Sequence, residues 1–432
     1  MSARLRAFRH RNYRLFFAGQ AVSLVGTWMQ QVAQGWLVLQ LTGDPFWLGA
    51  VATAQFGPVI VLGLFGGVVA DQLPKRRTLI VAQTVAMALA FVLFGLTAAR
   101  VVEVWHVMVL AMILGTANAI DMPTRQAFAV DMVGREDITN AVGLNSALFN
   151  GSRIVGPAVA GVLIGASDIS VAFLVNGLSF LGVIAAYLVM RDAELRPVEP
   201  IARPSSWRGV LDNLAEGARY VRHTPMVLLS LTVIGLVATF GMNFQVLVPP
   251  LADDVLDDGA SGFGFLMAAS GVGSTVAALA VAFSHRIRPP LIAVGAIALG
   301  LGSIALAWST SFALSLAMMA AAGAGAIAMM VTANTTIQSV VPDQLRGRVM
   351  SVYTTAFSAS VPVGGLLMGG IASGWGVPVA FGIGGALSVT VGVGAWVWLE
   401  RIRAAERRAA PGHVFTSGSA GAPEAPVGAA RP

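Results

Sequence analysis

Apolar runs recur along nearly all of the 432 residues of this chain. Most of them are long enough for a helix to cross the ~30 Å hydrocarbon core of a bilayer. Hydrophobic residues make up 56% of the chain and charged residues 11%, against about 25% charged residues in an ordinary globular domain. This composition excludes a soluble protein and predicts an all-α polytopic membrane protein with twelve transmembrane helices. The expected spans are residues 14–40, 46–70, 78–99, 104–125, 140–166, 170–190, 226–250, 260–283, 289–308, 311–338, 348–373 and 377–399.

Charged residues are distributed unevenly between the loops. With the N-terminus inside, the inner segments carry five arginines before the first span, the run Lys75–Arg77 and further arginines, whereas Arg100 is the one cation of the outer loops. Because Lys and Arg accumulate on the cytoplasmic side, we expect a multi-pass protein of the cell (inner) membrane with both termini cytoplasmic. The first apolar stretch is too long for a signal peptide, so we interpret it as a retained helix. The net charge of +6 follows from this orientation, and no nucleic-acid partner is expected.

Two similar halves are indicated by landmarks that recur 208 positions apart. The matching pairs are Phe149 and Phe357, Gly156 and Gly364, and Gly161 and Gly369. A polar stretch with an amphipathic segment near 207–220 separates the halves. The last residues are rich in Gly, Ala, Pro and Ser, a composition typical of disorder. We therefore predict six helices in residues 1–190, a cytoplasmic linker at 191–220, six helices in 221–401 and a disordered tail at 402–432.

A short motif marks the end of the second span. Gly67 precedes Asp71 by about one helical turn on the same face, and three cations follow at Lys75, Arg76 and Arg77. The glycine lets another helix approach closely, and the carboxylate can meet a neighbouring helix end or cation. This arrangement resembles the loop between the second and third helices of the major facilitator superfamily. A basic residue and a second glycine of the usual pattern are absent here.

The resemblance implies a cytoplasmic gating network near the inner ends of the second and fourth spans. Asp71 carries the acid of the motif, and Asp121 and Arg125 lie close to the predicted end of the fourth span. Asp121 and Arg125 are four residues apart, so an ordinary intrahelical ion pair is the alternative. The expected gating residues are Gly67, Asp71, Lys75, Arg76, Arg77, Asp121 and Arg125.

A second motif occurs in the fifth span. Gly156, Pro157 and Gly161 predict close helix packing and a local bend. They resemble the glycine-proline motif of exporters in the same superfamily, although Ala160 stands where that motif has a further glycine. The motif favours export over uptake. Simple packing between helices is the alternative interpretation.

Polar residues inside the spans predict a cavity. Gln31 and Gln34 belong to a polar stripe on one face of the first span, which points to a protein interior. Arg153 lies near mid-depth, where an unpaired cation is costly. It is either a counter-charge for an anionic or strongly polar substrate, or a structural hydrogen-bonding hub. No acid is expected at mid-depth, so neutral or anionic substrates are favoured over lipophilic cations. The candidate cavity residues are Gln31, Gln34, Arg153, Asn243, Asn334 and Tyr353.

Segments 69–71, 248–253 and 345–349 resemble the branch of the superfamily that contains the enterobactin exporter and macrolide efflux pumps, a branch of drug:proton antiporters. The resemblance implies a monomeric secondary transporter that exports a small organic molecule, such as a siderophore, drug or metabolite, by alternating access driven by protons. A non-transporting membrane sensor or an uptake transporter is the alternative. The sequence lacks phosphate-binding loops, zinc-ligand spacing and nucleophile elbows. No enzyme activity, catalytic residue, metal site or cofactor is therefore expected.

Overall fold

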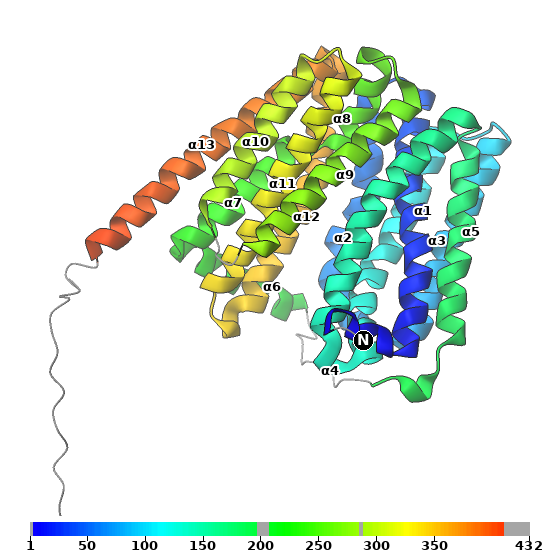
Figure 1. Cartoon of the computed structure of the whole chain (residues 1–432), viewed down its shortest axis with the longest axis horizontal. Helices are drawn as coiled ribbons and strands as arrows, with labels where there is room; N and C mark the ends of the chain where they lie inside the picture. The colour runs from blue at the N-terminus through cyan, green and yellow to red at the C-terminus, as the bar shows by residue number, and fades with distance from the viewer. Residues whose placement is uncertain (1–2, 197–206, 285–287, 410–432) are drawn as a thin grey trace, which may run out of the picture.

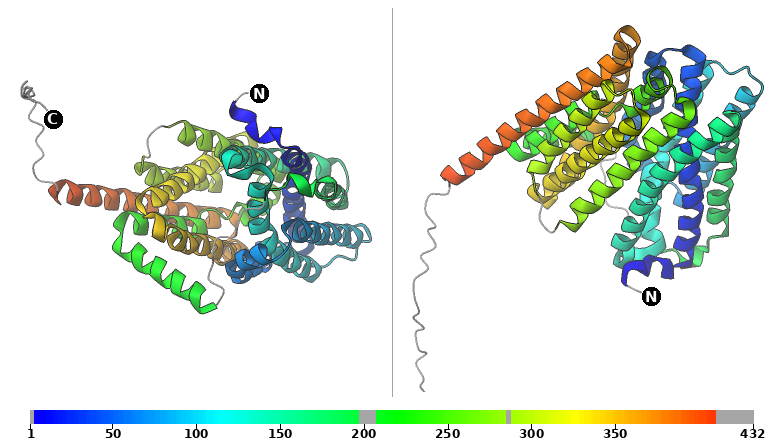
Figure 2. Two further views of the ribbon diagram at one scale, coloured as in Figure 1. Left: turned by 90° about the horizontal axis from the view of Figure 1, so that it is seen from below. Right: turned by 45° about the horizontal axis from the view of Figure 1, so that its top comes forward.

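The structure is a computed structural model that describes residues 3–196, 207–284 and 288–409, with side chains described except at 3–4, 63–72, 207–208, 210 and 406–409. Every regular element in these ranges is helical. The helices form two bundles that stand side by side in Figure 1 and Figure 2. The predicted all-α fold with two halves is therefore confirmed.

The amino-terminal half contains one helix that crosses the membrane twice. Its elements are η1 (Ala3–Arg9), α1 (Arg11–Thr42), α2 (Pro45–Gln72), α3 (Lys75–Ala98), α4 (Val104–Ala166) and α5 (Ser170–Val189). The 63 residues of α4 would extend about 95 Å if the helix were straight. The chain turns instead at Gly134, whose φ of 74° lies in the left-handed region that glycine adopts without steric cost. The two arms of α4, residues 104–133 and 135–166, correspond to the predicted fourth and fifth spans.

The carboxyl-terminal half follows a connecting segment that contains η2 (Asp192–Glu194) and the amphipathic helix α6 (Trp207–His223). Its elements are α7 (Pro225–Phe240), α8 (Phe244–Pro250), the π-helical turn η3 (Leu251–Val255), α9 (Gly259–Phe283), α10 (Pro290–Ala307), α11 (Phe312–Val340), α12 (Asp343–Trp375) and α13 (Val377–Ala409). α6 packs against α12 of this half, where Glu216 forms an ion pair with Arg348.

The seventh span is broken, whereas the sequence predicts one continuous helix over 226–250. A Cβ added at Gly241 would lie 2.3 Å from the hydroxyl oxygen of Ser388, so the chain passes very close to α13 there. The side-chain amide of Asn243 donates to the carbonyl of Thr239 at 2.7 Å and satisfies an acceptor near the end of α7. The break could not be predicted from the sequence, because the segment is mostly apolar throughout.

Ten helices in the described part of the chain are long and apolar enough to cross a membrane. These ten exclude α1, whose polar stripe lowers its hydropathy, and count α4 once although it crosses twice. With both allowances, the twelve predicted crossings are accounted for. α13 continues as a helix beyond the predicted end of its span, and an ion pair between Arg403 and Glu400 at 3.0 Å supports this extension.

The two halves meet at one end of the molecule and diverge toward the end that carries the N-terminus (Figure 1, and the right view of Figure 2). We call the latter the basic end, because Lys75–Arg77 and the turn of α4 lie there, and the former the far end. Two helix pairs cross between the halves at the far end, α2 with α12 and the second arm of α4 with α9.

Glycines allow these two crossings to be very close. A Cβ added at Gly49 of α2 would lie 2.2 Å from the carbonyl oxygen of Gly365 in α12. A Cβ added at Gly264 of α9 would lie 2.5 Å from the carbonyl oxygen of Pro157 in α4. These four residues form what we call the glycine seam. It closes the far end in this conformation.

Candidate functional site

A large polar space lies inside the amino-terminal half. It encloses about 740 Å³ of space that protein atoms do not fill, some of it open to solvent. α1, α2, α3, the first arm of α4 and α5 all contribute to its walls. We call it the amide chamber because eight of its lining residues are amides: Gln20, Gln30, Gln31, Gln34, Gln55, Gln83, Asn118 and Asn176.

The stripe on α1 supplies half of these amides, which explains how a polar helix remains stable in a membrane. Gln20 and Gln30 are buried in the bundle, and Gln30 accepts a hydrogen bond from Asn176 of α5 at 2.6 Å. Buried amides that bond to one another avoid the cost of desolvation without a partner. The sequence prediction that Gln31 and Gln34 line a cavity agrees with their place in the chamber wall.

A buried ion pair lies on the wall of the chamber. Asp121 accepts hydrogen bonds from Arg125 at 2.5 Å and from Gln83 of α3 at 2.9 Å, and Arg125 also donates to Gln20 of α1 at 3.0 Å. The sequence analysis places this pair near the inner end of the fourth span. The first arm of α4 in fact continues past it to Val133, so Asp121 lies well inside the helix. The pair is therefore farther from the end of its helix than the sequence predicts.

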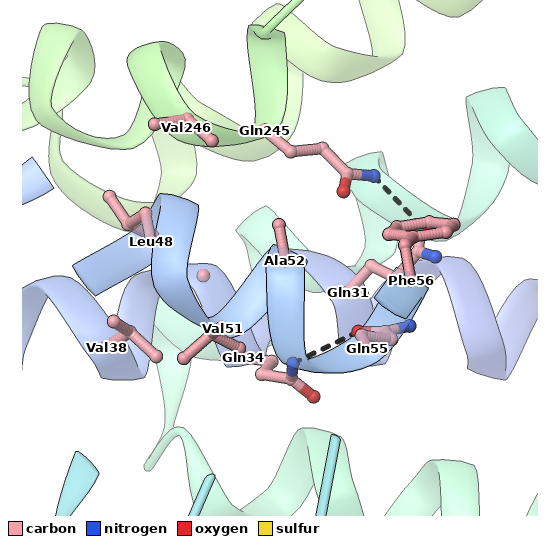
Figure 3. A pocket seen from close by; sticks show the side chains of 11 residues that line it. Gln31, Gln34, Val38, Leu48, Val51, Ala52, Gln55, Phe56, Gln245 and Val246 are labelled. Carbon is pink, nitrogen blue, oxygen red and sulfur yellow. Dashed lines mark hydrogen bonds between the residues drawn. The ribbon is translucent and has the colours of Figure 1, made fainter. Parts of the chain in front are cut away.

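A second polar pocket lies between the halves and shares lining residues with the chamber. It encloses about 420 Å³ and is lined by residues of α1, α2 and α8, as Figure 3 shows. Gln245 of α8 donates to Gln31 at 3.1 Å, and Gln34 donates to Gln55 at 3.4 Å. We call this space the interface pocket. Because Gln31, Gln34 and Gln55 line both spaces, a polar surface runs from Asp121 to the carboxyl-terminal half.

Arg153 lies on the second arm of α4 beside α1. Its guanidinium carbon is 5.8 Å from the centre of the Trp28 ring, and Phe149 meets the same ring edge-on at 5.5 Å. Arg153 is half-buried, and among the described residues its guanidinium forms no hydrogen bond or ion pair. Gly156 packs on α1 and Gly161 on α9. At ~100° per residue, Arg153 lies between those two faces of the helix, and it is not part of the wall of the chamber or the interface pocket.

The glycine-proline motif of the fifth span packs in two directions. A Cβ at Gly156 would lie 2.5 Å from Trp28 of α1, inside the same half. Pro157 and Gly161 meet α9 across the seam, where Ser261 donates to the carbonyl of Gly161 at 3.0 Å. The predicted close packing is therefore present and includes the contact between the halves.

The predicted gating cations form separate contacts at the basic end. Lys75 pairs with Asp131 of α4 at 2.7 Å, and Arg76 pairs with Asp192 at 2.6 Å. Arg77 is exposed. Gly67 and Asp71 belong to α2, but their side chains lie outside the described residues, so the gating role of this motif stays a prediction.

The remaining predicted cavity residues lie in the carboxyl-terminal half. Asn243 is buried at the break between α7 and α8, where its amide oxygen is close to Gly364 of α12. Asn334 of α11 and Tyr353 of α12 come together, and Tyr353 stacks on Phe357 with ring centres 6.5 Å apart. None of the three predicted residues is part of the wall of the chamber or the interface pocket. Their contact with substrate stays a prediction.

Four chamber residues were not singled out from the sequence: Gln55, Gln83, Asn118 and Asn176. Each is a single amide in a mostly apolar helical segment. A buried amide in a membrane helix needs a protein partner or a cavity, so isolation of this kind is the signal that could have identified them.

The two six-helix halves, the closed far end and the polar space between α1 and α8 define a membrane transporter of the major facilitator type. Residues 2–415 match the family of transmembrane secretion effectors (MFS_3), and the chain belongs to this family. It is therefore a multi-pass transporter and not an enzyme.

The relatives include proteins named as transporters, exporters and efflux pumps. The chain is 23% identical over 417 residues to the enterobactin exporter EntS of Escherichia coli, covering 95% of this chain and 96% of that one. It is 28% identical over 389 residues to the multidrug efflux pump Tap of Mycolicibacterium fortuitum, covering 86% and 91%. It is 24% identical over 267 residues to the staphyloferrin A transporter of Staphylococcus aureus, covering 62% and 66%. A solved variant of the nucleoside transporter NupG shares the fold, with a TM-score of 0.74, 12% identity and coverage of 90% and 98%.

Proposed function

We propose that this protein exports a small organic molecule by alternating access, and that Arg153 is the counter-charge that holds the substrate between the halves. The observation that carries the proposal is the half-buried guanidinium of Arg153, which has the Trp28 ring and no carboxylate as its described neighbour. A cation in this position is stabilised when an anionic or strongly polar group binds beside it. Gln31 and Gln34 of the interface pocket add donors and acceptors on α1, the helix that carries Trp28.

Two observations support export as the direction of transport. The glycine-proline motif of the fifth span, typical of exporters, forms part of the contact between the halves. EntS and Tap are both named for export or efflux. With both termini cytoplasmic in the plasma membrane, the closed far end faces outward and the diverging basic end faces the cytoplasm. The conformation is then the one that loads substrate from inside.

Neutral or anionic substrates fit this site better than lipophilic cations do. The one carboxylate found on the wall of the chamber, Asp121, is already paired with Arg125. A bound organic cation would therefore lack a free counter-charge, and its desolvation would not be offset. We propose that a proton gradient drives the cycle, and that the protein acts as a monomer.

The test is transport by purified protein in vesicles, with carboxyfluorescein, enterobactin, staphyloferrin A and ethidium as probes. We expect at least one of the three probes other than ethidium to be moved. Arg153→Lys should retain part of this activity and Arg153→Ala very little, with thermal stability nearly unchanged. Arg222→Ala, which removes an exposed arginine of α6, is the matched control.

Three outcomes contradict the proposal. Loss of folding in both Arg153 variants supports a structural role, because the contact of the guanidinium with the Trp28 ring then stabilises the fold. Saturable probe binding without movement by the wild-type protein supports a membrane sensor. Ethidium movement alone, blocked by an uncoupler, shows instead that the site recruits a carboxylate.

A further inference from the structure

The ion pair of Asp121 and Arg125 is the centre of a buried polar cluster with unused hydrogen-bonding atoms. Around it, Oε1 of Gln83 is buried without a hydrogen-bond partner among the described residues, and Nε2 of Gln20 and the hydroxyl of Tyr187 lie close to each other without forming a bond of good geometry. Gln20 comes from α1, Gln83 from α3 and Tyr187 from α5, so three helices converge on α4 at this point. Each unsatisfied buried atom costs about 1–3 kcal/mol, so such a concentration needs an explanation.

The ion pair itself determines which side-chain atoms of the neighbouring amides remain without a hydrogen bond. The carboxylate of Asp121 can only accept, so Gln83 must turn its NH2 group toward it, which leaves Oε1 free. Arg125 can only donate, so Gln20 must turn its oxygen toward it. The Tyr187 hydroxyl lies within electrostatic reach of both charges and next to Gln20.

Few other charged groups face this cluster. From α1, α3 and α5 it is met by Gln20, Gln83 and Tyr187, and the described part of α2 presents uncharged residues such as Gln55 to the same arm of α4. The neighbouring described charge pair on these helices, Lys75 with Asp131, lies toward the basic end. The cluster therefore holds one carboxylate and one guanidinium on the wall of a polar chamber.

The unused acceptors match what the protonated state requires. When Asp121 gains a proton, its new O–H needs an acceptor, and Oε1 of Gln83 becomes available by rotation of the amide. Arg125 then loses its carboxylate partner, and the Tyr187 hydroxyl oxygen is free to accept in its place. Two of these atoms, Oε1 of Gln83 and the Tyr187 hydroxyl oxygen, are those that a second charge state of the cluster would use, which a purely structural ion pair does not explain.

We propose that Asp121 takes up and releases one proton in each transport cycle, with the amide chamber as the path for water. The inference rests on the proposed secondary transport. A hydrated proton in the chamber is transferred to the carboxylate of Asp121, the contact with Arg125 breaks, and the net charge of the pair changes from zero to plus one. The reverse transfer returns the proton to water.

α1 connects this event to the substrate. Gln20, which holds Arg125, and Trp28, which covers Arg153, lie on α1 about 12 Å apart along the helix axis. Loss of the Asp121 contact frees Arg125 to change its bond to Gln20, and so alters how α1 is held against α4. The Trp28 ring and the Gln31 amide move with the same helix.

The experiment uses the reconstituted full-length protein, with the transported probe identified above and pyranine inside the vesicles. A gradient of one pH unit drives up to about tenfold accumulation of probe per coupled proton. We expect Asp121→Asn to exchange probe down its gradient but to lose both this accumulation and the accompanying proton flux. Asp121→Glu should restore both in part. Asp168→Asn, which removes a carboxylate of the outer loop before α5, should leave accumulation unchanged.

A second variant separates proton coupling from a structural role. Tyr187→Phe leaves the ion pair and the aromatic packing in place but removes the acceptor that Arg125 uses after protonation. The pH midpoint of transport should move to lower pH by roughly half a unit to one unit. Normal accumulation and proton flux in Asp121→Asn would falsify the proposal, and so would an unchanged pH profile in Tyr187→Phe. Absence of probe movement in the wild-type protein contradicts the proposed function instead.

Discussion

The two halves of the molecule have the same packing plan but different chemistry. Gly156 of the amino-terminal half packs on α1, and Gly364, its counterpart 208 positions later, packs on α7 at the equivalent place in the other half. Pro157 meets Gly264 across the seam, and its counterpart Gly365 meets Gly49. The repeat detected in the sequence is therefore a repeat of contacts.

Charges and amides do not follow this repeat. The position equivalent to Arg153 is Val361, and the described parts of α9, α10 and α11 contain no charged residue. The amide chamber and the pair of Asp121 and Arg125 belong to the amino-terminal half alone. Packing is therefore symmetric, whereas the charges and amides on which the proposed recognition and proton exchange depend lie on one side.

The largest effect on transport is expected from substitutions in the glycine seam, where the two crossings between the halves pack in the same way. Gly49→Ala and Gly264→Ala each place a methyl group against a carbonyl oxygen, at 2.2 and 2.5 Å in the present geometry. Overpacking of this kind costs about 1–3 kcal/mol, which shifts the balance toward the state with an open far end by roughly 5- to 150-fold. Transport should fall accordingly in both variants.

The measurement is labelling of single cysteines placed at the far end. The protein has no native cysteine, so the background is low. Gly57→Ala, also on α2 but with no atom within 4 Å of its added Cβ, is the matched control and should behave like wild type. If only one of the two seam variants increases labelling, the packing symmetry does not extend to the mechanism.

A smaller effect is expected on KM, and it should show which of the two halves binds substrate. Gln34→Leu removes an amide shared by both cavities, and the loss of one net hydrogen bond of about 0.5–1.5 kcal/mol predicts a KM roughly 2- to 12-fold higher. Asn334→Leu and Gln338→Leu alter the amides of α11 in the other half and should change KM less than Gln34→Leu does. Equal increases in all three would show that both halves recognise substrate.

Much of the fold could be predicted because it depends on long-range averages. Apolar runs, the distribution of arginine and the recurrence of Gly156 and Gly161 as Gly364 and Gly369 determine the spans and the halves. Local departures from a regular helix could not be predicted from the sequence. The break of the seventh span depends on the approach of Gly241 to Ser388, a residue 147 positions away.

The site was only partly predictable for a related reason. The stripe on α1 has helical period and is visible in one segment, so Gln31 and Gln34 could be assigned. The chamber, however, is formed where single amides of different helices meet, and Gln83 acquires its role only beside Asp121. The depth of Asp121 depended on the length of the first arm of α4, which polar residues after Arg125 obscured.

The basic end offers a last comparison, between two equivalent loops. The turn at Gly134 is tied to the N-terminus, because Asp137 is almost fully buried and accepts from His10 and Arg9, both at 2.8 Å. The corresponding loop of the other half has the ion pair of Asp343 and Arg346, in which the Asp343 side chain is 83% exposed. Exposed pairs of this kind contribute little to stability.

The smallest effect we expect is therefore on stability and depends on pH. The pKa of Asp137 is lowered from 3.8, mainly by its hydrogen bond with His10 and further by the charge of Arg9, while burial opposes the shift. A carboxylate with a lowered pKa stabilises the folded state above its ordinary pKa, and this contribution is lost as the pH falls through the lowered value.

Asp137→Asn should lower Tm by a few degrees at pH 7, and the difference from wild type should shrink below about pH 4. Asp343→Asn should leave Tm unchanged across the range, so thermal unfolding in detergent between pH 7 and pH 3 tests both loops. A constant difference between wild type and Asp137→Asn at every pH would mean that the charge of Asp137 is not what fixes the N-terminus to the turn at Gly134.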